Sequence, residues 1–410
     1  MAEIQPFRGV FYQVPERELP QVLAPPYDVI PPAYQAELYD RDPRNVVRAV
    51  LNRETGDAAY EGAGGTYRRW LSEGTLAADP EPALYLLEQS FDVSGRTLRR
   101  HGLLARFRAE DPEKRVILPH EHTRKAAKED RYRVLKATRA NFSPIFLMFP
   151  DPESRFAALA AAVSSYPPAL HYTDDGGVAH RLWRIADVEA VRAFAMLLAA
   201  PKAYIADGHH RHATALRYRD EVGADGAWTL GYFTPLEAPG LLVLPYHRIL
   251  SAGPSLKEAR DLLEAGPFRV TWVASAAEAA RGTEASRAPY AFALAAGGAG
   301  ALVAEALPAG TELLNAADPP SLRALDTYFF HKAVLARVLS IPEEAVSYVH
   351  SWAEAEEALA RGTCRLAALM RGTPVRQIVD VAEAGESMPA KSTFFHPKLP
   401  SGLVIHPLVV

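Results

Sequence analysis

Residues 203–216 read Ala-Tyr-Ile-Ala-Asp-Gly-His-His-Arg-His-Ala-Thr-Ala-Leu. The segment from Tyr204 to Ala206 is short and β-forming, so it predicts the buried end of a strand. Asp207-Gly208 is a turn pair. From His209 onward the apolar positions follow the spacing of a helix with one apolar face. The stretch therefore predicts a strand, a tight turn and a helix in direct succession.

A strand, a glycine turn and a helix start together form a site suited to anions. Backbone N–H groups and the positive end of the helix dipole point at whatever occupies the turn. His209, His210 and Arg211 add side-chain donors, and a guanidinium can hold phosphate oxygens bidentately. The alternative is an ordinary turn whose histidines cap backbone groups. Two histidines and an arginine after Asp207-Gly208 favour a phosphate or nucleotide site.

The composition is that of an ordinary globular protein. The residues are 49% hydrophobic and 23% charged. The length of 410 residues is enough for two or three domains. A net charge of −4 and a pI of about 6.4 argue against a general nucleic-acid binder. The single cysteine, Cys364, excludes an intrachain disulfide framework and a cysteine-based zinc site, and it fits a reducing cytoplasm. The N-terminus lacks an apolar signal core, and no run of about twenty apolar residues occurs. We therefore expect a cytoplasmic protein without nucleic-acid or membrane partners, and the oligomeric state stays open.

Strand and helix patterns alternate along the chain, though not strictly, which predicts a mixed α/β fold with a mixed sheet. After an apolar strand at 241–248 the sequence becomes rich in Ala and Gly. We place a lobe boundary there and expect a phosphate- or nucleotide-binding lobe at 1–250 and a smaller α/β lobe at 251–410. The tail at 385–402 can return to the site. The clearest elements predicted are helices near 57–71, 124–139, 187–199 and 256–264, and hairpin strands at 83–91 and 98–108.

A second polar stretch reads Val116-Ile-Leu-Pro-His-Glu-His-Thr-Arg-Lys125. If the strand that begins it continues, His120 and His122 share one face and Glu121 lies on the other. Paired histidines on a strand can bind a metal. However, no third ligand is evident, and the zinc-protease spacing requires histidines at i and i+4 on a helix.

The chain from 124 to 139 is locally basic, with seven Lys or Arg residues against Glu129 and Asp130. Most of these positions fit a solvated helix face. Against an acidic whole chain, the local positive charge also suits a polyanionic ligand. Lys125 and Arg131 are the candidate phosphate contacts from this run.

An N-terminal loop supplies one further candidate. Pro25-Pro26 forces an extended path, and Asp28 sits just past it. Asp28 is either part of a rigid connector or a carboxylate held on a stiff loop as a metal ligand or general base.

The tail nearly contains a phosphate loop. Gly385 to Ser392 fits the pattern G-x-x-x-x-G-K-[ST] except for Ala390 at the second glycine. That loop must open into a helix, which Phe394-Phe-His-Pro397 cannot continue, so we reject a standard phosphate loop. A turn carrying Lys391, Ser392 and Thr393 can still hold a phosphate, or it is a plain surface turn.

Five motifs together resemble, in order, those of the DUF1015 family over nearly the whole chain. His122 and His212 depart from the usual pattern, where an arginine-like residue and a tyrosine stand. The matching segments are Pro25–Ile30, Pro119–Thr123 with Asp130-Arg131, Ile205–Arg211, Pro245–Arg248 and Met388–Lys398.

The Asp207–Arg211 turn also resembles the phosphate-binding turn of the ParB/sulfiredoxin superfamily. That superfamily includes CTP-binding partition proteins, sulfiredoxin and free-serine kinases. The resemblance implies a ParB/sulfiredoxin-like N-terminal lobe and phosphorylation of L-serine, with a nucleotide such as ATP or ADP, or pyrophosphate, as donor. Sulfiredoxin chemistry is excluded because Cys364 is not beside the turn.

By this resemblance Asp207, His209, His210 and Arg211 form the catalytic cluster. The expected activity is transfer of a phosphoryl group to the hydroxyl of a small metabolite, with L-serine as the best candidate. Catalysis would rest on positioning and charge neutralisation, with Mg²⁺ bridging the donor oxygens. Asp207, Glu121 or Asp28 would bind Mg²⁺ or accept the hydroxyl proton, and the sequence does not decide between them. The expected binding residues are Gly208, His120, Lys125, Arg131, Lys391, Ser392, Thr393 and Asp28.

Two alternatives remain open. One is a ParB-like nucleotide-binding regulatory module without kinase activity, and the other is a metal-dependent hydrolase using His120, His122 and His209. We further expect residues 116–131 and 385–398 to approach the 207–211 turn. No stretch of the sequence has a pattern typical of an adenine pocket, so we expect the donor to be bound through its phosphates.

Overall fold

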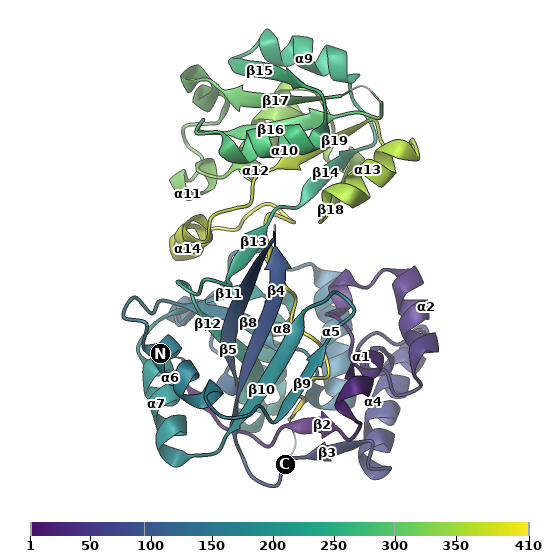
Figure 1. Ribbon diagram of the computed structural model, residues 1–410, viewed down its shortest axis with the longest axis vertical. Helices are drawn as coiled ribbons and strands as arrows, with labels where there is room; N and C mark the ends of the chain where they lie inside the picture. The colour runs from purple at the N-terminus through teal and green to yellow at the C-terminus, as the bar shows by residue number, and fades with distance from the viewer. Residues whose placement is uncertain (1, 94, 299, 409–410) are drawn as a thin grey trace. The chain divides into compact units, whose positions relative to one another are not determined.

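The computed structural model describes residues 2–93, 95–298 and 300–408 and divides into two compact units (Figure 1). Unit 1 comprises residues 1–119, 123–242 and 397–410, and unit 2 comprises 120–122 and 243–396. The short segment 120–122 belongs to unit 2, the long segment of unit 2 begins after Leu242, and the tail from Pro397 belongs to unit 1.

The described part of unit 1 contains helices and strands in mixed order. The helices are α1 (Leu19–Val22), α2 (Pro32–Arg41), α3 (Val47–Val50), α4 (Asp57–Ser72), α5 (Lys125–Thr138), α6 (Arg155–Ser164), α7 (Val188–Ala199) and α8 (His209–Val222). The strands are β1 (Ile4–Gln5), β2 (Val10–Tyr12), β3 (Leu76–Ala78), β4 (Leu84–Val93), β5 (Arg96–Arg108), β6 (Ile117–Leu118), β7 (Ala140–Asn141), β8 (Ile145–Phe149), β9 (Leu170–Thr173), β10 (Ala179–Ile185), β11 (Ala203–Asp207), β12 (Trp228–Pro235) and β21 (His406–Pro407).

Unit 1 is built on a mixed nine-stranded sheet. Its order is β6-β11-β8-β12-β5-β4-β10-β9, with β1 beside β5. The pairs β6–β11 and β8–β12 are parallel, and the other described pairs are antiparallel. The mixed α/β fold predicted from the sequence is confirmed.

Helices α6 and α7 cover one face of this sheet (Figure 1). Alternation along each strand sends every second side chain to that face, where Leu84 and Leu86 of β4 meet Phe156 of α6 and Phe194 of α7. Asp187 begins α7 as a side-chain cap that accepts from the Ala190 N–H at 2.9 Å. Burial of this aromatic and aliphatic layer stabilises unit 1.

Helices α5 and α8 pack on one another, and α8 also contacts β8 and β12. Tyr132 and Leu135 of α5 meet Tyr218 of α8 in a small buried cluster. This packing holds the later turns of α8 against α5, and α8 itself begins directly after β11, where the predicted anion turn lies.

Unit 2 contains a second, wholly antiparallel sheet of six strands in the order β15-β17-β16-β19-β14-β18. Its apolar core includes Ala279 of α10 and Ala355 of α13. The elements are β14 (His247–Leu250), β15 (Phe268–Val273), β16 (Ala291–Ala295), β17 (Ala301–Ala306), β18 (Val346–Val349), β19 (Leu366–Met370), β20 (Phe394–His396), α9 (Leu256–Glu264), α10 (Ala276–Ala285), α11 (Pro320–Arg323), α12 (Asp326–Phe329), α13 (Trp352–Ala360), α14 (Val375–Ala384) and a π-helix (Phe330–Val338). Strand β13 (Leu242–Leu244) spans the break between the units.

Two sequence predictions were wrong at prolines. The strand at 116–122 ends at Leu118, because Pro119 lacks the N–H that a ladder needs. His120 is fully buried and His122 is exposed, so they do not share a strand face. The predicted strand at 241–248 is likewise divided into β13 and β14 around Pro245. None of the described helices is both long and apolar enough to cross a membrane.

Candidate functional site

The turn between β11 and α8 has the local structure that the sequence predicts. Gly208 has a φ of 96°, a left-handed conformation that glycine adopts without steric cost, and α8 begins at His209. No side chain caps the N-terminus of α8. A Cβ at position 208 would lie 3.0 Å from Cζ of Arg211, so the missing side chain also makes room for that guanidinium. Gly208 therefore serves both the turn and the placement of Arg211.

Two cations contact the carboxylate of Asp207. Lys398 Nζ lies 3.2 Å and Arg211 Nη2 lies 3.4 Å from Asp207 Oδ2, and the three side chains are only 13–16% exposed. Burial alone would raise the pKa of Asp207, but Lys398, Arg211 and His209 outweigh it and hold that pKa well below its usual value. Arg211 Nη1 also donates to the Pro144 carbonyl. Asp207 is thus a firmly ionised anchor for two cations at the start of α8.

His210 lies near Arg124 and Asp28, which are both exposed. Its Nε2 accepts from the backbone N–H of Arg124 at 3.0 Å, so in the neutral ring Nδ1 carries the proton. Burial lowers the pKa of His210, Asp28 opposes this, and the cations Arg124, Arg211 and Lys128 lower it further. Asp28 is exposed on the short 3-10 turn Tyr27–Val29 and makes no ion pair with any described residue. The neutral imidazole of His210 therefore lies near the exposed carboxylate of Asp28.

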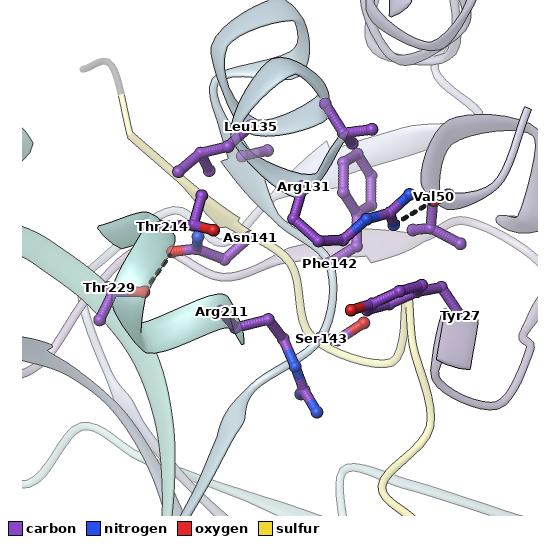
Figure 2. A pocket seen from close by; sticks show the side chains of 12 residues that line it. Tyr27, Val50, Arg131, Leu135, Asn141, Phe142, Ser143, Arg211, Thr214 and Thr229 are labelled. Carbon is purple, nitrogen blue, oxygen red and sulfur yellow. Dashed lines mark hydrogen bonds between the residues drawn. The ribbon is translucent and has the colours of Figure 1, made fainter. Parts of the chain in front are cut away.

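A small cavity of about 60 Å³ lies beside Arg211, with Tyr27 and Ser143 also on its wall. Figure 2 shows the side chains that line it. The Arg131 guanidinium stacks 3.9 Å from the centre of the Tyr27 ring, and it donates to Asp130 and to the Val50 carbonyl. Burial raises the pKa of Tyr27 to about 12, so its hydroxyl stays protonated. Arg131, expected as a phosphate contact, is instead a brace between α5, Tyr27 and the end of α3.

The remaining basic residues of α5 divide into two sets. Arg133 is paired with Asp57, and Lys136 is paired with Glu221. Arg124, Lys125 and Lys128 make no ion pair with any residue that the structure describes. The free cations of the predicted basic run therefore cluster at the start of α5, where Arg124 meets His210.

Five of the predicted site residues belong to unit 2. His120 and Thr393 lie 3.5 Å apart through Nε2 and Oγ1, and the chain at Glu121 forms a bridge with Met388. The Lys391 ammonium lies over the Tyr246 ring at 5.0 Å.

Ser392 is buried in unit 2, where its hydroxyl donates to the Pro389 carbonyl at 2.7 Å and its Oγ lies 3.1 Å from the Thr327 hydroxyl oxygen. These bonds stabilise the tail turn. The Ser392 hydroxyl, which the sequence suggested as a phosphate contact, is used in a hydrogen bond within the turn that carries it.

Two contributors were missed by the sequence reading. Lys398 stood at the end of a quoted motif but was not assigned to the site, and Tyr27 stood next to Asp28. The signal for Lys398 was its position after Pro397 in a polar, turn-rich tail. The expectation that the 116–131 and 385–398 stretches approach the turn is confirmed for Arg124 and Lys398.

Among residues 2–93, 95–298 and 300–408, no group of three or more His, Cys, Asp or Glu side chains is arranged to hold a metal ion. His120, His122 and His209, the ligands suggested for a hydrolase, form no such group in the described chain.

Comparison with known families gives one match. Residues 4–328 match the family described as a protein of unknown function, DUF1015. The chain belongs to the DUF1015 family. No curated protein matches this DUF1015 chain.

Several solved structures are similar to parts of the DUF1015 chain. A free serine kinase variant in complex with AMP has a TM-score of 0.36 and 14% identity, covering 68% of this chain and 83% of that one. A conserved hypothetical protein from Pyrococcus furiosus has a TM-score of 0.34 and 15% identity, covering 70% and 90%. SbnI with a C-terminal truncation from Staphylococcus aureus has a TM-score of 0.36 and 12% identity, covering 72% and 84%. With TM-scores below 0.5, we assign no function from these likenesses.

Proposed function

We propose that this protein is a phosphotransferase that binds the phosphates of its donor at the Asp207–Arg211 turn. One observation carries the proposal: Lys398 and Arg211 converge on Asp207 at the uncapped N-terminus of α8. One carboxylate and two cations leave a net positive charge there, in line with the helix dipole. The free cations of Arg124, Lys125 and Lys128 at the start of α5 extend this charge toward a polyphosphate.

Asp207 is poorly suited to act as the general base. A base works best when its pKa lies near the operating pH, whereas Lys398 and Arg211 depress the pKa of Asp207 far below that range. We assign Asp207 the role of a positioning residue, which holds both cations in place before the donor arrives.

Asp28 is the better candidate to accept the proton of the substrate hydroxyl. It is exposed, has no ion-pair partner among the described residues, and lies within electrostatic range of His210. The neutral His210 can offer its Nδ1–H as a hydrogen-bond donor to the same substrate. The unit 2 residues His120, Glu121, Lys391, Ser392 and Thr393 receive no role in this proposal.

The carboxylates near the turn fit Mg²⁺ only in part. Asp207 is already held by two cations, and Asp28 is the available carboxylate. Mg²⁺ is usually held by one or two carboxylates together with substrate phosphates, so Asp28 could provide the protein ligand. When bound, Mg²⁺ would neutralise charge on the donor oxygens.

The acceptor we propose to test first is L-serine, and the donors are ATP, ADP, CTP and pyrophosphate. The proposed setting is the cytoplasm. AMP is the ligand named for a similar solved structure, and it serves here only as a further compound to test.

The deciding experiment is a donor screen with L-serine and Mg²⁺, followed by phosphorus NMR for a new phosphomonoester. The Arg211→Ala variant should lose turnover, whereas Arg217→Ala should keep it. Arg217 provides a matched control because it lies on the same helix, pairs with Glu129 and is half exposed. Donor binding without any phosphomonoester would favour the regulatory-module alternative. No binding of any donor would refute the proposal.

A further inference from the structure

A second pocket lies in unit 1 at the far ends of α5 and α8. Its volume is about 720 Å³, within the range of small-molecule sites. Tyr218, Glu221 and Val222 come from the last turns of α8, about 15–21 Å along that helix from Gly208. Strand β21, which pairs with β7, supplies another wall. The pocket is therefore separate from the Asp207–Arg211 turn.

At this pocket, Arg139 and Arg106 make no ion pair with any residue that the structure describes. Lys136 and Glu221 neutralise each other in an ion pair. Arg139, the left-handed residue that ends α5, is exposed and has no ion-pair partner in the described chain. Arg106 donates through Nη2 to Gln5 Oε1 at 2.7 Å, and its buried Nε has no hydrogen-bond partner among the described residues. Two guanidinium groups that no carboxylate of the described residues neutralises favour an oxyanion.

The remaining histidine on the wall does not add charge. Burial lowers the pKa of His406 to about 3, so the ring is neutral near pH 7. Its Nδ1 lies 3.1 Å from Asn141 Oδ1, which also accepts the Leu230 N–H. Because that oxygen is an acceptor, Nδ1 carries the proton and holds the ring against β7.

Aromatic and aliphatic surfaces complete the wall. The Arg106 guanidinium lies 4.9 Å from the centre of the Trp228 ring. Tyr218 is 6% exposed and packs with Leu408, and Val222 at the rim is 48% exposed. A ring or alkyl body can gain contact area here while its charged end meets the guanidinium groups.

We infer that this pocket, between the ends of α5 and α8 and strand β21, binds an aromatic oxyanion. Arg139 and Arg106 recognise the carboxylate or phosphate group, and Trp228 and Val222 contact the ring. The inference does not depend on phosphoryl transfer at Asp207, because the two sets of residues do not overlap.

Isothermal titration calorimetry with phenyl phosphate tests this inference. We expect phenyl phosphate to bind at least about tenfold more tightly than inorganic phosphate or phenol. Inorganic phosphate lacks the ring that contacts Trp228, and phenol lacks the anionic group that meets the guanidinium groups. Benzoate is the parallel probe, and tighter binding of benzoate than of phenyl phosphate would identify a carboxylate ligand of the same class. Equal binding of inorganic phosphate or phenol, or no binding of either aromatic anion, would overturn the inference.

Variants then locate the site. In Arg139→Asn the new asparagine tolerates the left-handed conformation of position 139, so the fold should be retained. The variant should weaken binding about tenfold or more, as expected for one lost charge-assisted hydrogen bond. Val222→Glu should weaken binding and Val222→Lys should retain it. Arg192→Gln, an exposed charge removal on α7, should leave the affinity unchanged.

Hydrogen exchange on the wild-type chain provides a readout of position. Phenyl phosphate should protect amides in 218–222 and 405–408. Protection confined to 207–211, or unchanged affinity in Arg139→Asn, would refute a ligand site at this pocket.

Discussion

Replacing Lys398 by Met tests whether the ion pair with Asp207 anchors the turn. The ammonium lies 3.2 Å from Asp207 Oδ2, with side chains 13% and 16% exposed. At an effective dielectric constant of about 20, the Coulomb attraction at this distance is about 5 kcal/mol. Loss of the ammonium also removes its own desolvation cost, and Arg211 still faces the carboxylate at 3.4 Å. We therefore expect about 2–3 kcal/mol of destabilisation, somewhat below the value for a buried charge left alone.

The pH dependence of this loss gives a sharper test. The folded-state pKa of Asp207 is depressed, so its ion pairs stabilise the protein above the unfolded pKa of about 3.9 and lose their effect as pH falls toward the folded pKa. Lys398→Met should raise the folded pKa of Asp207. The stability difference between wild type and variant should therefore be constant near pH 5–7 and shrink below about pH 4, by about 1 kcal/mol per pH unit.

Equilibrium urea unfolding followed by tryptophan fluorescence measures both effects, with separate transitions fitted if the two units unfold independently. Lys114→Met is the matched control, because its pair with Glu110 at 2.5 Å involves a lysine that is 57% exposed. An exposed pair should contribute at most about 1 kcal/mol. A Lys398→Met variant no less stable than Lys114→Met, or a difference that does not change between pH 6 and pH 3, would refute the assigned role of Lys398.

Three further predictions concern activity at the turn. Arg211→Ala should lower kcat/KM by about 10²-fold or more with the fold intact by circular dichroism, since a charge-assisted contact to the transferring group is lost; near-native turnover would remove Arg211 from the site. Gly208→Ala should cost about 1–2 kcal/mol and also weaken donor binding, because its Cβ meets Arg211, whereas Gly385→Ala, with φ of 71° and no atom near the added Cβ, should show only the stability loss. Asp28→Asn should lower kcat by about 10²-fold with donor affinity unchanged by calorimetry; a parallel loss of Mg²⁺-dependent donor affinity would instead make Asp28 a metal ligand.

The local structure around the site was predictable because it depends on neighbouring residues. Two β-forming runs at 83–91 and 98–108 are enough to predict the β4–β5 hairpin, and Asp207-Gly208 before a helical pattern is enough to predict the start of α8. Each of these features depends on periods of two or 3.6 residues and on the conformational freedom of glycine, which a single stretch of sequence displays.

The partners of the charged side chains were not predictable in this way. Lys398 meets Asp207 across 191 positions, and Arg131 meets the Val50 carbonyl across 81. A basic residue in a helical run gives the same sequence signal whether it faces solvent, a backbone carbonyl or a ligand. Tertiary packing decides between these, which is why Arg131 was assigned to phosphate and Lys398 was overlooked.

The contacts of Arg211 change how its role should be understood. The sequence predicted a guanidinium at the turn with all its N–H groups available to a ligand. In the structure, one nitrogen donates to the Pro144 carbonyl and another faces Asp207. These contacts fix the guanidinium before any ligand arrives, so less side-chain entropy remains to be lost on binding. The same contacts reduce the number of N–H groups left for an incoming oxyanion. Phosphate recognition at this turn would therefore depend on the summed charge of Arg211 and Lys398 and on the helix dipole, more than on a bidentate grip by one arginine.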